Sequence, residues 1–231
     1  MNPASWVRAA SELGGTALLV GIGTGTVVAA HRVGGIPQWL MAVAWFLAVL
    51  IPILVFVRVS GAHLNPVVTL SLAVSGRVGW AEVPVYLLGQ FAGALLGSLS
   101  VWIGLGNEAH LGATVPTIGS LVLVFGLEAI FTALLVVSVF VLSDRGEGRA
   151  RWRLTLPPLA VGVSTFLIGP WTGSSLNPAR SIAPALLSQT YTDLWVYLLA
   201  VVVGGLAVAV CWRPRAVDRL DRGPGRTTTD R

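Results

Sequence analysis

The chain contains an internal repeat, in which three sequence features occur twice in the same order. They are the pattern E-x-x-x-T-x-L-L, the tripeptide L-N-P and the tetrapeptide V-Y-L-L, which begin at Glu12 and Glu128, Leu64 and Leu176, and Val85 and Val196. The copies are 116, 112 and 111 residues apart. One such match between apolar segments carries little weight, but three in register indicate two structurally equivalent halves.

Long apolar runs divide each half further. At roughly 20 apolar residues per crossing, they predict six membrane-spanning helices, over residues 6–30, 37–57, 82–104, 118–142, 153–170 and 194–212. A chain with 55% apolar and 11% charged residues belongs in lipid, and its length leaves no room for a separate soluble catalytic domain. Because each half has an odd number of crossings, the second half enters the membrane inverted. We therefore predict an all-α membrane protein with an inverted 3+3 repeat.

The domain limits follow from the same runs. Repeat one covers about 6–104 and repeat two about 118–212, within one membrane domain over 1–212. All 15 basic residues are arginine, and many lie in 145–153 and 213–231. Positive charge on cytoplasmic segments explains this pattern better than nucleic-acid binding does. It predicts a multi-pass protein of the plasma or inner membrane with both termini in the cytoplasm, and the tail 213–231 is expected to be mobile.

Each half also contains an apolar segment that is too short to cross the bilayer, over 64–75 and 176–188. Both contain Asn-Pro near the start, at Asn65-Pro66 and Asn177-Pro178. Asn is a favoured helix cap and Pro suits the first helical turn, so each pair predicts the beginning of a half-helix. Irregular backbone at membrane depth is tolerated where it is buried in protein or lines a wet cavity. Two such helix starts therefore predict a water-filled lumen near the midplane.

The lumen has predictable electrostatics. Each helix start carries about half a positive elementary charge, so the meeting point repels protons and cations. The Asn65 and Asn177 amides are free to donate N–H groups to the oxygen of one passing molecule. A water molecule held this way cannot accept a proton from its neighbour in the file. Water and small neutral solutes would pass while proton hopping is interrupted.

The segments GAHLNPVVTL and SLNPARS resemble the paired signature of the major intrinsic proteins, the superfamily of aquaporins and glycerol facilitators. The likeness runs from about Glu12 to Trp212. The second copy has the usual Asn-Pro-Ala, ending at Ala179, whereas the first has Val67 where Ala is usual. This change adds bulk behind the first Asn and is expected to leave the cap intact. The resemblance implies one pore per subunit, a homotetramer and no cofactor.

Arg180 lies three residues into the second half-helix, where a charged side chain needs water or a partner. One interpretation is an ion pair with a buried Glu. The resemblance implies the other, in which Arg180 lines the narrow outer filter together with Trp45, Thr165 and Ser174. Strict water channels usually have Phe and His where this chain has Trp45 and Thr165. Trp45 is similar to glycerol facilitators and nodulin-like intrinsic proteins, and the small Thr165 and Ser174 imply a wider opening. Taken by itself, a lone Trp in a membrane helix is more commonly a core or lipid-facing aromatic, and only the resemblance places Trp45 in the pore.

Other positions bear on the solute. Ser181 and Ala185 are similar to water channels, and Tyr197 followed by Leu198 is similar to the nodulin-like intrinsic proteins. Together they imply a pore for water, glycerol and neutral metalloid acids such as arsenous acid. An ion- or proton-coupled secondary transporter is the alternative, because such proteins also use inverted repeats and broken helices. No coupling carboxylate lies beside the Asn-Pro segments, and three His without metal-ligand spacing give little support for an enzyme or a metal site.

Glu12 and Glu128 lie in apolar runs, where an unpaired charge is costly. The resemblance places both inside the bundle, accepting hydrogen bonds from the two re-entrant loops, and a proton relay is the alternative role. His63 either faces the cytoplasmic vestibule or bonds a loop carbonyl. Gly89, Gly93 and Gly97 form a flat stripe suited to close helix packing, within the subunit or between subunits.

Overall fold

The computed structural model describes residues 3–143 and 154–212, which fold entirely into helices and connecting loops. The predicted mobile tail 213–231 and the Arg-rich stretch 145–153 lie outside the described residues. The helices are α1 Pro3–Arg32, α2 Gln38–Ser60, α3 Pro66–Val74, α4 Val83–Leu105, a short 3-10 helix η1 Ala109–Gly112, α5 Leu121–Ser143, α6 Leu156–Thr172, α7 Pro178–Ser188 and α8 Leu194–Cys211.

Six long helices correspond to the six predicted crossings. Within the described residues, α1, α2, α4, α5 and α8 are long and apolar enough to span a membrane. Helix α6 has 17 residues, at the short end of the spanning range of about 17–25. It begins at Leu156 rather than 153, because Pro157 and Pro158 occupy its first turn, where their missing N–H groups cost no helical hydrogen bond. Helix α5 begins at Leu121 rather than 118, after Ser120, whose hydroxyl accepts from the Leu123 N–H.

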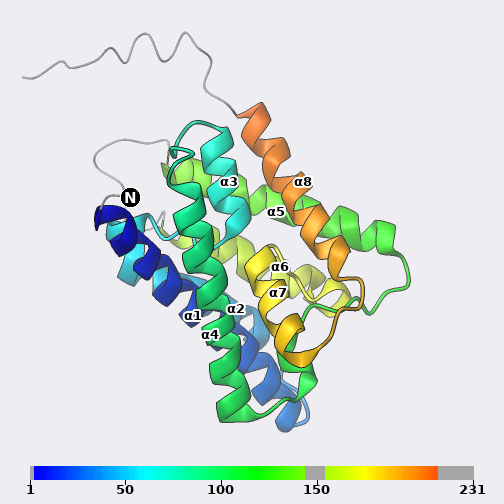
Figure 1. Cartoon of the computed structure of the whole chain (residues 1–231). Coiled ribbons are helices and arrows are strands. Elements are labelled where there is room, and N and C mark those ends of the chain that lie inside the picture. Colours follow the sequence, from blue (N-terminus) through cyan, green and yellow to red (C-terminus); the bar gives the residue numbers. More distant parts are fainter. Residues whose placement is uncertain (1–2, 144–153, 213–231) are drawn as a thin grey trace, which may run out of the picture.

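The two repeats pack alike. Helix α1 lies against α4 and α2, while α5 lies against α8 and α6, and α2 and α6 join the halves (Figure 1). The glycine stripe of α4, Gly89, Gly93 and Gly97, faces α1 so closely that an added Cβ would meet backbone oxygen atoms of that helix. Gly204 on α8 has the same relation to a carbonyl of α5. The stripe therefore packs within the subunit, and the equivalent glycines bring equivalent helices together.

The half-helices α3 and α7 fill the centre of the bundle from opposite ends. Figure 1 shows α3 towards the end that holds the beginning of α1 and the end of α8, with α7 towards the other end. Helix α3 packs on α8 of the second repeat, and α7 packs on α4 of the first. Each half-helix is therefore held by a long helix of the opposite repeat. The six crossings and two re-entrant half-helices of the predicted architecture are present.

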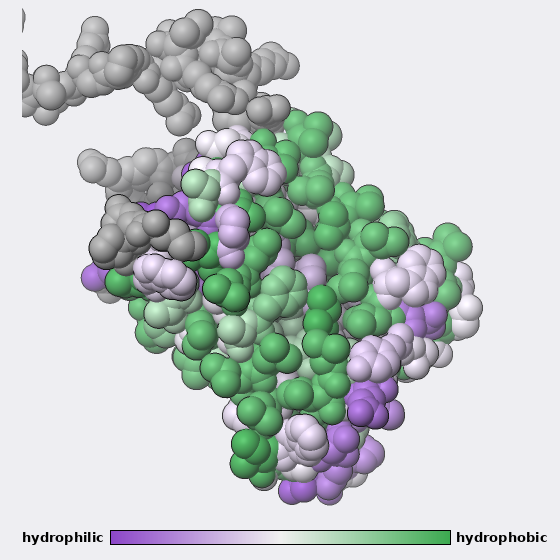
Figure 2. Space-filling model, in the orientation of Figure 1, coloured by the Kyte–Doolittle hydropathy of each residue, from purple (hydrophilic) through white to green (hydrophobic). Residues whose placement is uncertain are grey.

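The outer surface is apolar over the middle of the molecule (Figure 2). Large apolar side chains project outward from the long helices, including Leu54, Ile103 and Val122, which are 58%, 78% and 85% exposed. Hydrophilic residues gather near the ends of the bundle in this view. A soluble monomer seldom exposes so large a continuous apolar surface, so lipid or neighbouring subunits must cover it.

Candidate functional site

The loops before the two half-helices have the same irregular backbone. Gly61 and Gly173 end α2 and α6 in the left-handed conformation, with φ of 84° and 79°. Leu64 and Leu176, just before each Asn, also have positive φ, at 56° and 53°. Left-handed backbone costs a residue with a Cβ roughly 1–2 kcal/mol. Both loops therefore need an external partner to hold them in this shape.

Glu12 is that partner in the first repeat. Its Oε1 accepts from the His63 N–H at 2.9 Å and from the Ser60 hydroxyl at 2.6 Å. Its Oε2 accepts from the Leu64 N–H and from Gln90 Nε2, both at 2.7 Å. The carboxyl group is fully buried and is surrounded by donors from the loop, α2 and α4. It therefore holds two N–H groups of the first loop in place.

Glu128 makes the equivalent contacts in the second repeat. It accepts from the Ser175 N–H at 3.0 and 3.1 Å, from the Leu176 N–H at 3.1 Å, and from the Thr172 hydroxyl at 2.7 Å. This carboxyl group is also fully buried. The two acidic residues thus occupy equivalent places in the inverted repeats, each behind one re-entrant loop.

Each loop ends at an Asn that caps the half-helix. The Asn65 Oδ1 accepts from the Val67 N–H at 2.9 Å. The Asn177 Oδ1 accepts from the Ala179 N–H at 3.0 Å and from the Arg180 N–H at 3.3 Å. Both Asn residues have extended backbone, with Pro at the next position, as N-caps require. These contacts fix each amide oxygen towards its own helix, so the amide nitrogen faces away from it.

The amide nitrogens bind across the repeat boundary. Asn65 Nδ2 donates to the Leu176 carbonyl and Asn177 Nδ2 donates to the Leu64 carbonyl, each at 2.8 Å. The prediction that both amides are free donors is wrong for one N–H of each. Because an amide carries two N–H groups, one remains for a passing molecule. The crossed pair brings the tips of α3 and α7 together at the centre of the bundle.

Arg180 is buried on α7, with an exposed fraction of 2%. Its Nη1 donates to the Gly112 carbonyl in η1 at 2.8 Å, and its Cζ lies 4.5 Å from the centre of the Trp45 ring. Neither ion pair found among the described residues involves Arg180. Within the described residues, the guanidinium is therefore held by a carbonyl and an aromatic face and forms no direct ion pair.

Trp45 comes from α2 and is seated against α1. An added Cβ at Gly23 of α1 would overlap the indole ring, so Gly23 provides the space for it. Ser174, from the second loop, shares a 2.7 Å hydrogen bond with Ser164 of α6. Trp45, Ser174 and Arg180 border the same cavity. Gly23, Gly112 and Ser164 were not predicted from the sequence. For Gly23 the only signal is a G-x-G-x-G run in α1, which does not single out one glycine.

Thr165 is the fourth residue predicted for the filter. It lies on α6 beside Ser164 and is buried. Its carbonyl accepts from Gln38 Nε2 at 2.6 Å, which ties α6 to the start of α2. Thr165 is not among the residues that border the cavity. Its place in the filter stays a prediction.

The cavity has a volume of about 70 Å³ and is bordered by both repeats, with room for several water molecules. Most of its wall is apolar, from α2, α5 and α6. Its polar border comprises His63, Asn65, Ser174, Ser175, Asn177 and Arg180. The cavity passes both half-helix tips, and at one end it meets Trp45 and Arg180. An apolar passage with a few polar groups in line is suited to small uncharged molecules.

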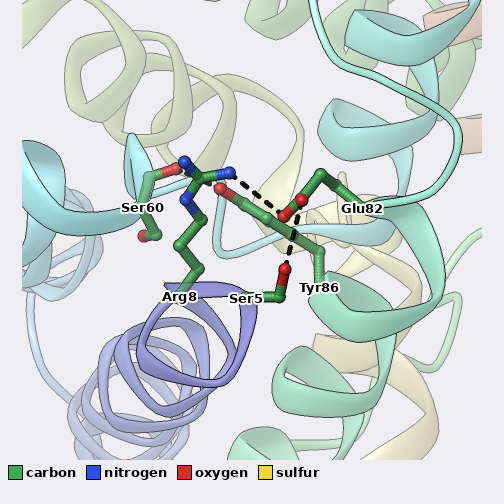
Figure 3. A network of polar contacts seen from close by, with 5 residues as sticks. All are labelled: Ser5, Arg8, Ser60, Glu82 and Tyr86. Carbon is green, nitrogen blue, oxygen red and sulfur yellow. Dashed lines mark hydrogen bonds and ion pairs between the residues drawn. The ribbon is translucent and has the colours of Figure 1, made fainter. Parts of the chain in front are cut away.

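At the other end, polar contacts fasten the first loop to the bundle (Figure 3). The Tyr86 hydroxyl donates to the Ser60 carbonyl at 2.7 Å. Arg8 forms a 3.1 Å ion pair with Glu82, which also accepts from the Ser5 hydroxyl at 3.2 Å. These contacts tie the start of α1 to the end of α2 and the start of α4. None of these five residues borders the cavity.

His63 borders the cavity next to this network. Its ring stacks on Tyr86 at 4.6 Å between centroids, and its Nδ1 lies 3.1 Å from the Thr69 hydroxyl. The partner of this nitrogen is therefore a hydroxyl of α3 instead of a loop carbonyl. His63 faces the passage and is held by both α3 and α4.

Comparison with known proteins agrees with this geometry. The major intrinsic protein family model matches residues 1–212. The chain is 40% identical to aquaporin NIP1-1 of Zea mays over 211 residues, covering 87% of this chain and 71% of that one. It is 36% identical to putative aquaporin NIP4-1 of Arabidopsis thaliana, covering 84% and 69%. The X-ray structure of the aquaglyceroporin from Plasmodium falciparum matches with a TM-score of 0.79 and 27% identity, covering 94% and 100%. The chain belongs to the major intrinsic protein family.

Proposed function

We propose that this chain is a passive membrane channel for water and small uncharged solutes, including glycerol and neutral metalloid acids such as arsenous acid. The observation that carries the proposal is the pair of capped half-helices whose Asn amides border one cavity from opposite repeats. Relatives named aquaporin and a structural neighbour named aquaglyceroporin support this class of function. The coupled-transporter alternative is not favoured.

Selection at the centre depends on Asn65 and Asn177. Each retains one N–H for the oxygen of a passing molecule, since the other is bonded to the opposite loop. Each half-helix adds about half a positive charge at its tip. A water molecule there donates outward in both directions and accepts from the amides, so the chain of proton transfer is broken. Pro66, Val67, Pro178 and Ala179 form the first turns that hold the two amides in place.

Selection at the outer end depends on Arg180, with Trp45, Ser174 and Thr165 completing the filter. The Arg180 side chain borders the cavity, and its Nε is buried and makes no hydrogen bond within the described residues. Its positive charge repels cations, while the indole face of Trp45 offers an apolar wall to the carbon skeleton of a polyol. Glu12 and Glu128 act as scaffold residues, since all the contacts described for them hold loops and neighbouring helices.

The surroundings of the channel follow from charge and surface. The domain covers 1–212, with the repeats over about 6–104 and 118–212. Arginine-rich segments after α5 and α8 favour an orientation with both termini in the cytoplasm. The membrane is then the plasma membrane or the inner membrane of the cell. The exposed apolar faces fit lipid on some sides and sister subunits on others, and the family resemblance favours a homotetramer.

Solute flux into proteoliposomes tests the proposed function. In stopped-flow light scattering, we expect water, glycerol and arsenite permeation above that of protein-free vesicles, unchanged when ion gradients are collapsed. Permeation of water alone would show that the wide-filter inference is wrong. Flux that disappears with an ion gradient would favour the transporter.

Mercurials should inhibit this channel only weakly. Cys211 is the only cysteine of the chain, lies exposed at the end of α8 and does not border the cavity. Ser174 occupies the filter position at which some relatives have a reactive cysteine. Water permeability should therefore stay within about twofold of the untreated value at mercury concentrations that label an exposed thiol. Strong inhibition that is lost in Cys211→Ser would contradict this expectation.

A further inference from the structure

The residue after each Asn-Pro pair packs behind the cap, and the two repeats fill this place differently. Val67 in α3 and Ala179 in α7 are equivalent positions, 112 residues apart. Both are buried, with exposed fractions of 1% and 0%. Val67 lies against α8 of the opposite repeat, and the helix α7 that carries Ala179 packs on α4. A larger side chain in the first repeat therefore needs additional space on α8.

Helix α8 provides that space at Gly205. A Cβ added there would overlap Val67 Cγ1 and would lie 3.0 Å from the Ser71 hydroxyl, also on α3. Valine cannot easily turn aside, since a β-branched side chain in a helix is largely restricted to one rotamer. The absence of a side chain at Gly205 is thus what admits Val67 at this depth.

The other repeat has the opposite arrangement of sizes. Gly204 and Gly93 are equivalent and 111 residues apart, so Gly205 corresponds to Ala94. Ala94 and Ala179 are both fully buried in one apolar cluster. The first half-helix therefore meets its long helix through Val67 and Gly205, whereas the equivalent positions of the other repeat are both alanine.

We propose that Val67 and Gly205 are a size-compensated pair that positions Asn65 in the lumen. This inference rests on the proposed channel function. The Val67 N–H is bonded to Asn65 Oδ1 at 2.9 Å, so a displacement of the first turn of α3 carries the cap with it. The same displacement would lengthen the 2.8 Å bond from Asn65 to the Leu176 carbonyl. The packing behind the cap thereby sets the geometry of the constriction in front of it.

Gly205→Ala and its rescue by Val67→Ala test the pair. In proteoliposomes with equal amounts of inserted protein, Gly205→Ala should lower water permeability at least about fivefold, as expected of an overpacked helix crossing. The double variant V67A/G205A reproduces the Ala and Ala arrangement of the other repeat and should return to within about twofold of wild type. The glycerol-to-water flux ratio should change in Gly205→Ala and recover in the double variant, which a simple loss of folded protein would not cause.

Gly204→Ala is the matched control. Its added Cβ would meet the Ala129 backbone instead of a side chain, so Val67→Ala should not rescue it. Wild-type permeability and flux ratio in Gly205→Ala would overturn the proposal, as would a double variant no better than Gly205→Ala. If Gly205→Ala fails to insert, the double variant alone tests the proposal. It should then insert and conduct water, and a double variant that fails to do so would contradict the proposal. Absence of flux in the wild type would instead refute the proposed function itself.

Discussion

Replacing Glu12 by Leu should prevent the channel from folding. Four donors would lose their acceptor, namely the N–H groups of His63 and Leu64, the Ser60 hydroxyl and the Gln90 amide. An unsatisfied buried donor costs about 1–3 kcal/mol, so the loss is at least roughly 4 kcal/mol, a large part of the stability of a typical domain. Fluorescence-detected size-exclusion chromatography in detergent should show no monodisperse peak after membrane extraction.

Two further variants separate this effect from a loss of charge. Glu12→Gln keeps one acceptor oxygen and should retain a reduced but measurable monodisperse fraction. Glu108→Gln removes an exposed acid paired with Arg32 near the outer ends of α1 and α4, which should change stability by no more than about 1 kcal/mol. A Glu12→Leu protein with the melting temperature of the wild type would show that the first loop does not depend on this carboxyl group.

Replacing Arg180 by Ala should make the channel leak cations and protons. The guanidinium is buried, is not paired with a carboxylate of the described residues, and lies at the end of the cavity beside Trp45. A unit charge about 4 Å from the path opposes a cation by about 4 kcal/mol at an effective dielectric constant of 20. The half-helix tips retain part of the barrier, so we expect a proton leak at least about tenfold above wild type. Glycerol flux should also rise, because the opening becomes wider.

Pyranine fluorescence in proteoliposomes under an imposed pH gradient measures the leak. Arg58→Ala is the control, since Arg58 is an exposed arginine near the end of α2 and does not border the cavity. It should leave proton and glycerol flux unchanged. An Arg180→Ala channel that still excludes protons would assign the whole barrier to the half-helices and remove Arg180 from the filter.

The sequence was most informative where local chemistry decides the structure. Asn followed by Pro is a strong helix-start signal by itself, so both half-helices could be located within a few residues. The crossings were predictable because lipid requires long apolar helices. The surroundings of Arg180 could not be predicted in the same way. Gly112 meets Arg180 through a backbone carbonyl, which no side-chain pattern encodes, and it follows three residues of positive φ, Ala109, His110 and Leu111.

Tertiary pairing accounts for the remaining differences. The sequence does not tell which N–H of Asn65 or Asn177 is engaged, because the acceptors lie in the other repeat. It also gives no reason to expect α3 to pack on Gly205 instead of Gly204. Neighbouring glycines cannot be distinguished until the rotation of α8 about its axis is known. Val67 alone was noticeable as a departure from the family pattern.

The crossed bonds at the centre have a consequence for how such a molecule can be assembled. Each repeat supplies one donor amide and one acceptor carbonyl, and the partner repeat supplies the complementary two. This is the self-complementary arrangement of a twofold dimer interface. Two identical three-helix chains inserted in opposite orientations could form the same pair of hydrogen bonds. The geometry of this junction therefore does not itself require the two halves to be joined in one chain.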